Sequence, residues 1–179
     1  MTGRPEEETL EAPGIVLRPP TAADAPRLTE ILREPAVAAW WPRWDEARVR
    51  AEITEGPDRE PGWVITTDGG AIAGWLQYGE EAEPDYPSVW FDLFLATEAR
   101  GRRLGPKALR RVIEVFVERG HHRFVIDPSA ANERAVRAYA AVGFRPVGIM
   151  RRYERAPDGS WRDGLLMDLL AEELCPPFA

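Results

Sequence analysis

Hydrophobic and polar positions along the chain predict a succession of strands and helices. Short apolar runs with β-forming residues predict strands near 15–18, 63–66, 72–78, 89–95, 123–127, 144–155 and 161–170. Apolar positions at helical spacing predict helices near 24–34, 45–55, 106–119 and 132–142. The strand, helix, strand crossover from 89–95 to 123–127 requires a parallel pair. We therefore expect an α+β fold with a mixed, mostly antiparallel central sheet flanked by helices.

The length of 179 residues suits one compact domain, which we expect to span 14–171. Residues 1–13 are rich in glutamate and contain no apolar stretch, so we expect a disordered N-terminal segment that is not a secretory signal. Residues 172–179 are expected to form a C-terminal tail. No apolar run is long enough to cross a membrane, which argues against a membrane partner.

The net charge of −7 argues against binding nucleic acid, whose phosphates require a basic face, and favours cationic partners. The single Cys175 rules out an internal disulfide and fits a cytoplasmic location. His121 and His122 adjoin no cluster of further ligands, so no metal site is expected. The sequence leaves open whether the chain is a monomer or a homodimer.

An arginine-rich turn, 100–106, lies between the predicted strand 89–95 and the helix that follows it. Backbone N–H groups at a helix N-terminus bind anions, and flanking arginines suit a diphosphate. A tight turn with solvated arginines is the alternative. About thirty residues later, 132–144 has the pattern N-x-x-A-x-x-x-Y-x-x-x-G-F, set by Asn132, Ala135, Tyr139, Gly143 and Phe144.

Together these two motifs resemble the GNAT superfamily of acetyl-CoA-dependent N-acetyltransferases, over almost the whole of 15–170. The resemblance implies acetyl-CoA as co-substrate and two strands that splay apart to receive its pantetheine arm. It implies that Tyr139 protonates the departing thiolate and that a backbone N–H near Phe94 and Leu95 polarises the carbonyl. The implied cofactor-binding residues are Phe94, Leu95, Arg100, Arg102, Arg103, Leu104, Gly105, Lys107, Asn132 and Tyr139.

The turn departs from the family pattern at one position, because Arg103 stands where the first glycine is usual. An arginine fits there only if its φ stays negative or strain is tolerated. Pro106 also removes one amide just after the second glycine position. We interpret the arginine charge as a partial replacement for the lost close backbone approach.

Within the superfamily the chain is most similar to aminoglycoside 6′-N-acetyltransferases, through Trp40 and Trp41, Phe91 to Phe94, and Asp127-Pro128-Ser129. This implies acceptor contacts by Trp40, Trp41, Asp92 and Asp127, and a small polycationic amine as substrate. The residue pattern supports one of these contacts independently of the resemblance. Asp92 interrupts an apolar strand, where a carboxylate seldom serves stability, and it could hold an ammonium or accept its proton.

Each assignment has a structural alternative. Asp92 could be a satisfied structural residue, Asp127 could belong to an Asp-Pro turn, and Tyr139 could be an ordinary core residue. The tryptophans could close the edge of the core, and the acidic loop 80–85 could be solvated surface. The competing functions are acetylation of another small amine such as a siderophore-like lysine derivative, acetylation of a protein N-terminus, and non-catalytic sensing of acyl-CoA.

Overall fold

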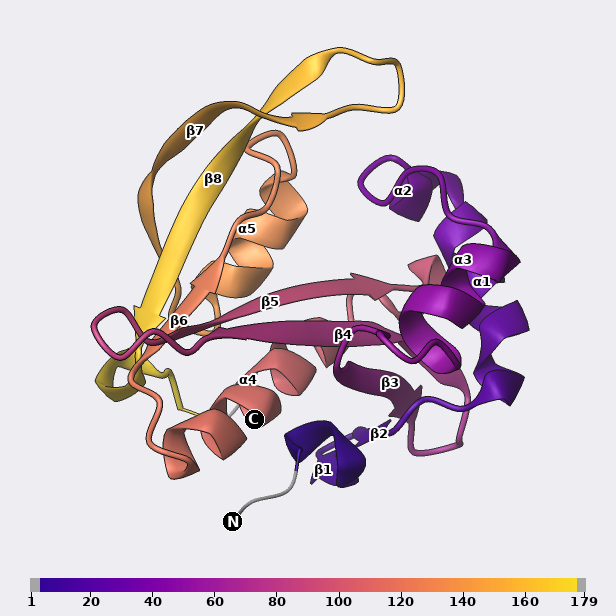
Figure 1. Cartoon of the computed structure of the whole chain (residues 1–179), viewed down its shortest axis with the longest axis horizontal. Coiled ribbons are helices and arrows are strands. Elements are labelled where there is room, and N and C mark those ends of the chain that lie inside the picture. Colours follow the sequence, from indigo (N-terminus) through magenta and orange to yellow (C-terminus); the bar gives the residue numbers. More distant parts are fainter. Residues whose placement is uncertain (1–3, 177–179) are drawn as a thin grey trace.

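The computed structural model describes residues 4–176 and contains an eight-stranded sheet in the order β1-β2-β3-β4-β5-β6-β8-β7 (Figure 1). Only β5 and β6 pair in parallel, and the other neighbours are antiparallel. The predicted mixed sheet is therefore confirmed. The strands are β1 (Leu10–Ala12), β2 (Ile15–Arg18), β3 (Gly62–Thr67), β4 (Ile72–Glu81), β5 (Ser88–Leu95), β6 (Arg123–Ile126), β7 (Arg145–Arg155) and β8 (Trp161–Leu170).

The helices are α1 (Ala25–Arg33), α2 (Pro35–Ala38), α3 (Glu46–Val49), α4 (Leu104–Glu118) and α5 (Glu133–Ala140), with a π-helical turn (Arg50–Thr54) after α3. Pro106 was expected at the first helical position, but α4 begins at Leu104. Its missing N–H still falls in the first turn, where no partner is lost. Gly120 follows the helix at φ 94°, as the predicted stop requires. None of these helices within 4–176 is both long and apolar enough to cross a membrane.

The side chains of β5 alternate between two differently covered faces. Phe91 packs edge-on against Phe116 of α4, with ring centroids 5.9 Å apart. Phe94, on the other face, packs edge-on against Trp41 in the loop after α2, at 5.1 Å. Asp92 shares the face of Phe94 because side chains two apart in a strand point the same way. The strand therefore directs this carboxylate toward the α2 loop and away from the α4 side of the core.

The N-terminal segment differs from the expected disorder. Residues Pro5–Glu7 form a 3₁₀ turn and β1 pairs with β2. Glu6 is buried and accepts a hydrogen bond of 2.6 Å from the hydroxyl of Tyr78, while the indole of Trp63 donates to the carbonyl of Glu8 at 3.0 Å. These polar anchors hold a segment that lacks apolar periodicity. Residues 1–3 lie outside the described part.

The expected C-terminal tail is also packed where it is described. Residues Ala171–Glu173 form a 3₁₀ turn, and the amide of Cys175 donates to the carbonyl of Val142 at 3.1 Å. Residues 177–179 lie outside the described part.

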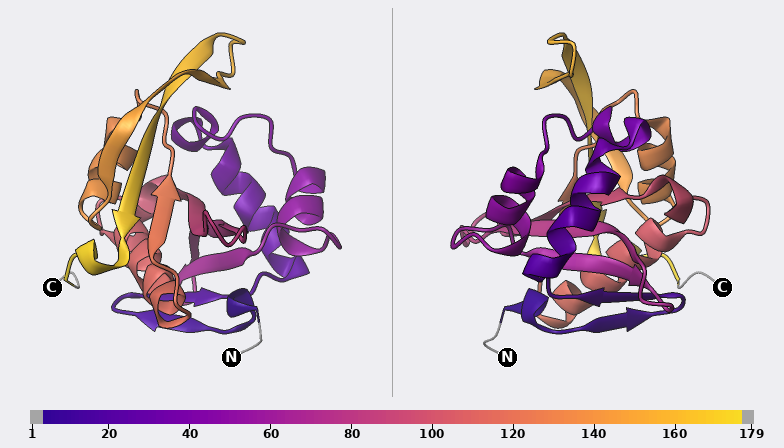
Figure 2. Two further views of the ribbon diagram at one scale, coloured as in Figure 1. Left: turned by 60° about the vertical axis from the view of Figure 1, so that its left-hand side comes forward. Right: turned by 90° about the vertical axis from the view of Figure 1, so that its right-hand side faces the viewer.

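Strands β5 and β6 part after two paired positions. Val89 pairs with Phe124 and Trp90 with Val125, and no pairing of the two strands follows. The edge of β5 from Phe91 to Leu95 consequently faces no strand on that side. Seen from the side, β6, β7, β8 and α5 lean away from the rest of the sheet (Figure 2). The splay that the resemblance implied is present.

Candidate functional site

An apolar cleft of about 470 Å³ opens where β5 and β6 part. Its walls are the end of β5, the start of α4, α5 and the loop after α2. Phe94, Leu95, Gly105 and Pro106 line it, together with Tyr139 at its inner end. A Cβ added to Gly105 would lie 3.2 Å from a methyl of Leu95, so glycine allows α4 to approach β5 closely at this point.

The apolar cleft continues into an arginine-lined hollow of about 750 Å³ around the 100–106 turn. Arg100, Arg103, Arg134 and Arg137 border it, and no carboxylate from residues 4–176 does. The amides that begin α4 also lie here, so the hollow combines a helix N-terminus with cationic side chains. Sequence reasoning missed Arg134 and Arg137, which α5 brings to this wall because they stand three residues apart on one helical face.

Arg103 adopts the left-handed conformation that its position in the turn demands, at φ 58° and ψ 20°. Of the two outcomes expected for an arginine here, strain is therefore the one realised. Arg100 borders the arginine-lined hollow and also makes structural hydrogen bonds. Its guanidinium donates to the carbonyls of Ala36 at 3.2 Å and Leu95 at 3.4 Å. Burial lowers the pKa of Arg100. These bonds brace the end of β5 against α2.

Two predicted cofactor residues lie elsewhere. Arg102 is exposed and borders neither the apolar cleft nor the arginine-lined hollow. Lys107 donates from Nζ to the carbonyl of Pro13 at 3.0 Å, beside β1. One helical position separates Lys107 from Pro106, and this rotation turns its side chain away from the cleft. The geometry thus groups Phe94, Leu95, Arg100, Arg103, Gly105, Asn132 and Tyr139, with Leu104 on the hollow.

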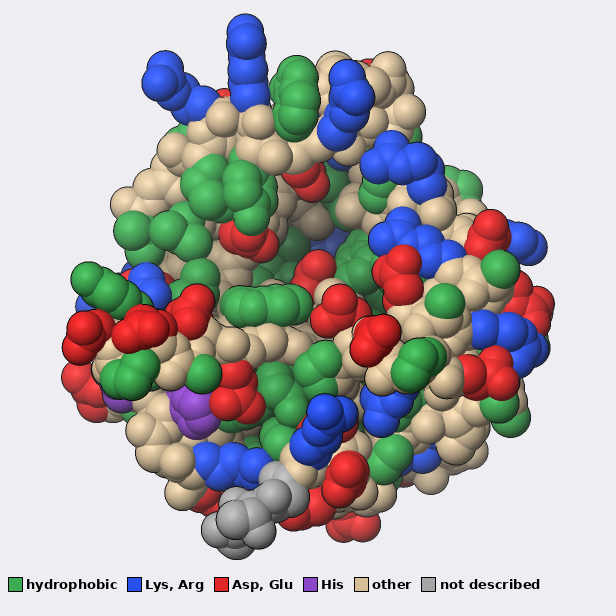
Figure 3. All heavy atoms as spheres, viewed as in Figure 1, with side chains coloured by type: hydrophobic (Ala, Val, Ile, Leu, Met, Phe, Trp, Pro, Cys, Tyr) green, Lys and Arg blue, Asp and Glu red, His purple; other side chains and the backbone are tan. Residues whose placement is uncertain are grey.

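An acidic cavity of about 510 Å³ adjoins the apolar cleft, and Trp41, Leu93 and Tyr139 border both spaces. The surface is hollowed between the β7–β8 hairpin and α2, with acidic side chains around the opening (Figure 3). Five carboxylates and two guanidinium groups line it, which leaves an excess of negative charge. They are Glu52, Glu60, Asp92, Asp127 and Glu154, with Arg43 and Arg48.

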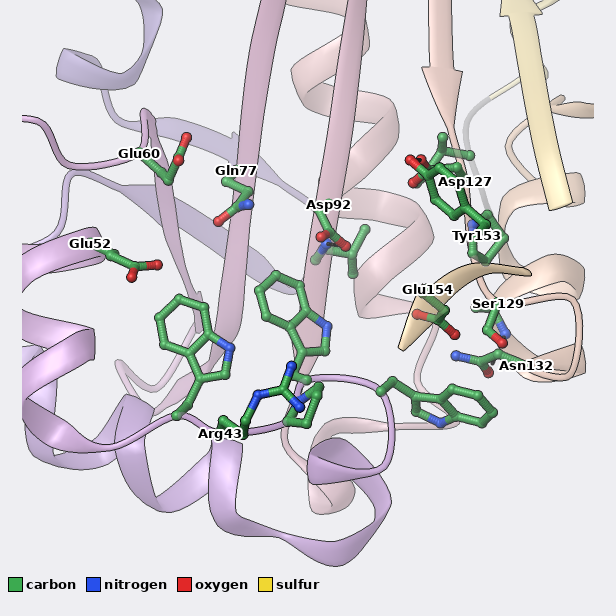
Figure 4. Close-up of a pocket in the computed structure, with 18 of the residues that line it drawn as sticks. Arg43, Glu52, Glu60, Gln77, Asp92, Asp127, Ser129, Asn132, Tyr153 and Glu154 are labelled. Carbon is green, nitrogen blue, oxygen red and sulfur yellow. Dashed lines mark hydrogen bonds between the residues drawn. The ribbon is translucent and has the colours of Figure 1, made fainter. Parts of the chain in front are cut away.

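Asp92 lies at the centre of this cavity, between two groups of polar side chains (Figure 4). Its Oδ1 accepts from the amide of Leu93 at 3.0 Å. Burial raises the pKa of Asp92 to about 7, and the nearby negative charge of Asp127 adds to that increase. A carboxyl group with this pKa exchanges a proton near neutrality, as a general base must.

Tyr139 of α5 lies where the acidic cavity and the apolar cleft meet and borders both. Its side chain is buried, and burial raises the pKa of its phenol, with further contributions from Asp92 and Asp127. The phenol therefore stays protonated at neutral pH and can act as a donor. Asn132 caps the same helix, accepting from the amide of Ala135 at 3.2 Å, and it borders both spaces as well. The predicted cap is confirmed.

Asp127 follows β6 and faces the cavity from the wall opposite α3. Its Oδ2 accepts a hydrogen bond from the hydroxyl of Tyr153 on β7. This bond, together with burial, raises the pKa of Tyr153 to about 12. Asn132, and not Asp127, caps the helix that follows.

The tryptophans after α2 make different contacts. Trp41 packs against Phe94 and lies 5.9 Å from Trp44, so it contributes to the core edge. Trp40 lies under the guanidinium of Arg162 from β8, at 5.1 Å, and this arginine also donates to the carbonyl of Ala39 at 2.9 Å. Trp40 and Trp41 both border the apolar cleft and the acidic cavity.

Several cavity residues were missed by sequence reasoning. Gln77 is the register partner of Asp92 on β4, a position that only the strand pairing reveals. Tyr153 and Glu154 come from β7, whose alternation is interrupted. Glu52, Glu60 and Ser129 complete the set. The acidic loop 80–85, by contrast, borders no part of the cavity.

Among residues 4–176, no group of three or more His, Cys, Asp or Glu side chains is arranged to hold a metal ion. His121 instead packs edge-on against Phe116, at 5.3 Å, and lies 3.6 Å from Glu80.

Comparison with known proteins gives a family match. A family model described as an acetyltransferase (GNAT) domain matches residues 15–145. A search of curated protein sequences found no significant match.

Solved structures resemble the chain over most of its length. A Mycobacterium smegmatis RimJ in complex with CoA-disulfide is 28% identical, with a TM-score of 0.76 over 94% of this chain and 88% of that one. The aminoglycoside acetyltransferase AAC(6')-Ib in complex with coenzyme A and kanamycin is 26% identical, with a TM-score of 0.70 over 89% and 96%. A ribosomal-protein-S5-alanine acetyltransferase from Vibrio fischeri, 19% identical, has a TM-score of 0.76 over 94% and 100% and shares the fold.

Proposed function

Because the chain belongs to the GNAT family of acetyltransferases, we propose that it transfers the acetyl group of acetyl-CoA to a primary amine of a small polycationic acceptor, most specifically the 6′-amine of an aminoglycoside. The observation that carries this proposal is the meeting of the apolar cleft and the acidic cavity at Tyr139 and Leu93, with Asp92 on the acidic side next to Leu93. A thioester in the first space and an ammonium in the second would meet between the side chains of Asp92 and Tyr139.

The apolar cleft and arginine-lined hollow fit coenzyme A. The unpaired edge of β5 offers backbone groups to the pantetheine amides, as an added strand would use them. Arg103, Arg134 and Arg137, with the amides at the start of α4, suit its phosphates. When bound, acetyl-CoA supplies an activated acyl group.

The chain's own residues would move two protons. Asp92, with its pKa near 7, holds the ammonium and accepts the proton that the nitrogen must lose. The nitrogen then forms a bond to the acetyl carbon while the carbon–sulfur bond breaks. Tyr139 donates its phenolic proton to the departing sulfur. The second proton that the nitrogen loses on becoming an amide returns to Tyr139 through solvent, and Asp92 releases the first proton to solvent. An amide N–H on the Phe94 to Leu95 stretch is expected to polarise the carbonyl.

The preference for a polycation rests on the charge of the acidic cavity. Its excess of carboxylates favours an acceptor with several ammonium groups, and AAC(6')-Ib, whose structure contains kanamycin, resembles the chain over most of its length. A protein N-terminus is the second candidate, because a ribosomal-protein-S5-alanine acetyltransferase shares the fold.

Steady-state acetylation tests the proposal directly. We expect turnover of kanamycin or tobramycin, which is measured as the release of free thiol from acetyl-CoA. Peptides carrying ribosomal-protein N-termini and a hydroxylysine derivative form the comparison panel. Turnover of a peptide with none of the aminoglycosides would replace the first candidate by the second, and coenzyme A binding without turnover of any amine would leave a sensor.

A further inference from the structure

The β7–β8 hairpin carries an irregularity beside the acidic cavity. Met150 pairs with Gly164 and Glu154 with Arg162, so three residues of β7, 151–153, stand opposite the single residue Asp163. Such a bulge bends a strand and redirects its side chains. Tyr153 and Glu154 leave this bulge and line the acidic cavity, although most of β7 is exposed.

The bulge contains a residue in an unfavourable backbone conformation. Arg152 has φ 53°, in the left-handed region that costs a non-glycine residue about 1 kcal/mol or more. The carboxylate of Asp163 compensates by accepting a hydrogen bond of 2.8 Å from the amide of Arg152. Strain that is held by a specific contact next to a site is a feature that often serves function.

Asp163 also contacts the segment that follows Asp127. Its backbone carbonyl accepts from the amide of Ala130 at 2.8 Å, in the segment that follows Asp127. The next residue, Gly164, bridges to Ser129. One residue of β8 thereby ties the bulge to the segment that carries Asp127.

Tyr153 also joins the bulge to Asp127, through its side chain. Its ring lies across Gly164, where an added Cβ would come within 2.8 Å of the ring and 2.9 Å of Met150. Its hydroxyl donates to Oδ2 of Asp127. One oxygen of Asp127 is thus occupied by a phenol, and the other is left for a ligand.

We propose that Asp163, by pinning the left-handed Arg152, is a positioning residue that holds Tyr153 against Oδ2 of Asp127 and so leaves Oδ1 as the oxygen that meets the acceptor's ammonium. This inference rests on the proposed function, because it concerns how the amine is oriented. The phenol uses one lone pair of Oδ2, whereas both lone pairs of Oδ1 can accept from an ammonium. The bulge therefore determines which amine of a polyamine reaches Asp92.

Kinetics of three hairpin variants test the role of Asp163, with the amine that the wild-type protein acetylates. Asp163→Ala should raise KM for that amine about 5- to 10-fold, since the hydrogen bond that holds the left-handed Arg152 is lost, with kcat and KM for acetyl-CoA within about twofold of wild type. Asp163→Asn keeps an acceptor for the Arg152 amide and should retain the wild-type KM. Asp158→Ala is the matched control, because Asp158 likewise accepts from a backbone amide, that of Ser160 at 2.9 Å, at the hairpin turn.

A double-mutant cycle separates positioning from general stability. If Asp163 acts through Tyr153, adding Asp163→Ala to Tyr153→Phe should change KM by less than about twofold. Additive effects would overturn the proposal. So would an Asp163→Asn variant as impaired as Asp163→Ala, or an Asp163→Ala variant that changes only thermal stability.

An acceptor-independent measurement keeps this test distinct from that of the proposed function. The phenol of Tyr153 faces Asp127, Asp92 and Glu154, and its pKa is about 12. In Asp163→Ala it should ionise at lower pH, seen as extra ultraviolet absorbance between about pH 9 and 11 relative to the same variant carrying Tyr153→Phe. An unchanged titration would overturn the positioning role. A changed titration without turnover of any amine would retain it and refute the proposed function.

Discussion

The most informative single residue is Asp92, whose carboxyl group is held at a pKa of about 7 by burial and by Asp127. Because the folded state raises this pKa above the ordinary 3.8, the folded chain binds a proton more tightly than the unfolded chain. Its contribution to stability is therefore lost as the pH rises from about 4 to 7. The same shift makes the ionised form, which a base requires, dominant only above neutrality.

We expect Asp92→Asn to separate these two consequences. The variant should lose most of its acetylation activity but be more stable than the wild type at pH 8, by at most about 4 kcal/mol, since no buried carboxylate has to ionise at position 92. Urea unfolding at pH 8 and at pH 4 measures this, and the difference should shrink at the lower pH. Asp58→Asn, at an exposed position, is the control. Equal stability of Asp92→Asn and wild type at pH 8 would contradict the raised pKa.

In the wild type, kcat/KM should rise with pH through about 7.

Tyr139 provides the second prediction for a single side chain. Tyr139→Phe keeps the buried ring but removes the proton donor, so kcat should fall about 100-fold. Binding of coenzyme A, measured by calorimetry, should change little, because the ring remains in place. A variant with normal kcat would show that solvent protonates the thiolate and that Tyr139 is a structural residue.

At the scale of elements, the 100–106 turn and α4 form a strained cradle. Arg103 holds the left-handed conformation at φ 58°, which costs arginine and alanine similarly but costs glycine little. Two substitutions therefore separate charge from backbone conformation. Arg103→Ala retains the strain and removes the charge, whereas Arg103→Gly removes both.

Both variants should weaken the binding of acetyl-CoA, because a cation at the arginine-lined hollow is lost. Arg103→Gly should also raise the free energy of unfolding by about 1 kcal/mol relative to Arg103→Ala. Calorimetry and urea unfolding give the two quantities. An acetyl-CoA Kd that does not weaken in Arg103→Ala would show that the charge does not replace the close approach of a glycine.

Periodicity predicted the elements well and the irregular positions poorly. Asp92 could be assigned to a cavity-facing strand because it interrupts an apolar run in a regular element. Tyr153 and Glu154 could not, because the bulge opposite Asp163 breaks the alternation that such reasoning needs. The ordered N-terminal segment was missed for a related reason: its anchors, such as the bond between Glu6 and Tyr78, join polar residues far apart in the sequence. Local patterns carry no information about such contacts.

At the scale of the whole molecule, the sheet is held together at one end of the β5–β6 pair and open at the other. In the described part of the chain only Val89 and Trp90 of β5 pair with β6, and beyond them the apolar cleft separates the end of β5 from α5. A ligand that pairs with both sides of this opening would bind the folded chain and not the unfolded one. Coenzyme A should therefore stabilise the protein by linkage as well as by its local contacts.

Thermal unfolding measures this coupling. At a coenzyme A concentration about 100 times its Kd, stabilisation of about 2.7 kcal/mol is expected, which for a chain of this size raises Tm by about 5–10 °C. Adenosine 3′,5′-bisphosphate lacks the pantetheine arm and can occupy only the arginine-lined hollow. At the same concentration as coenzyme A it should raise Tm less, because it binds more weakly. Equal shifts would place the binding energy in the phosphate contacts and not in the opening of the sheet. No shift with either ligand, for a protein with a cooperative transition, would contradict the cleft as a coenzyme A site.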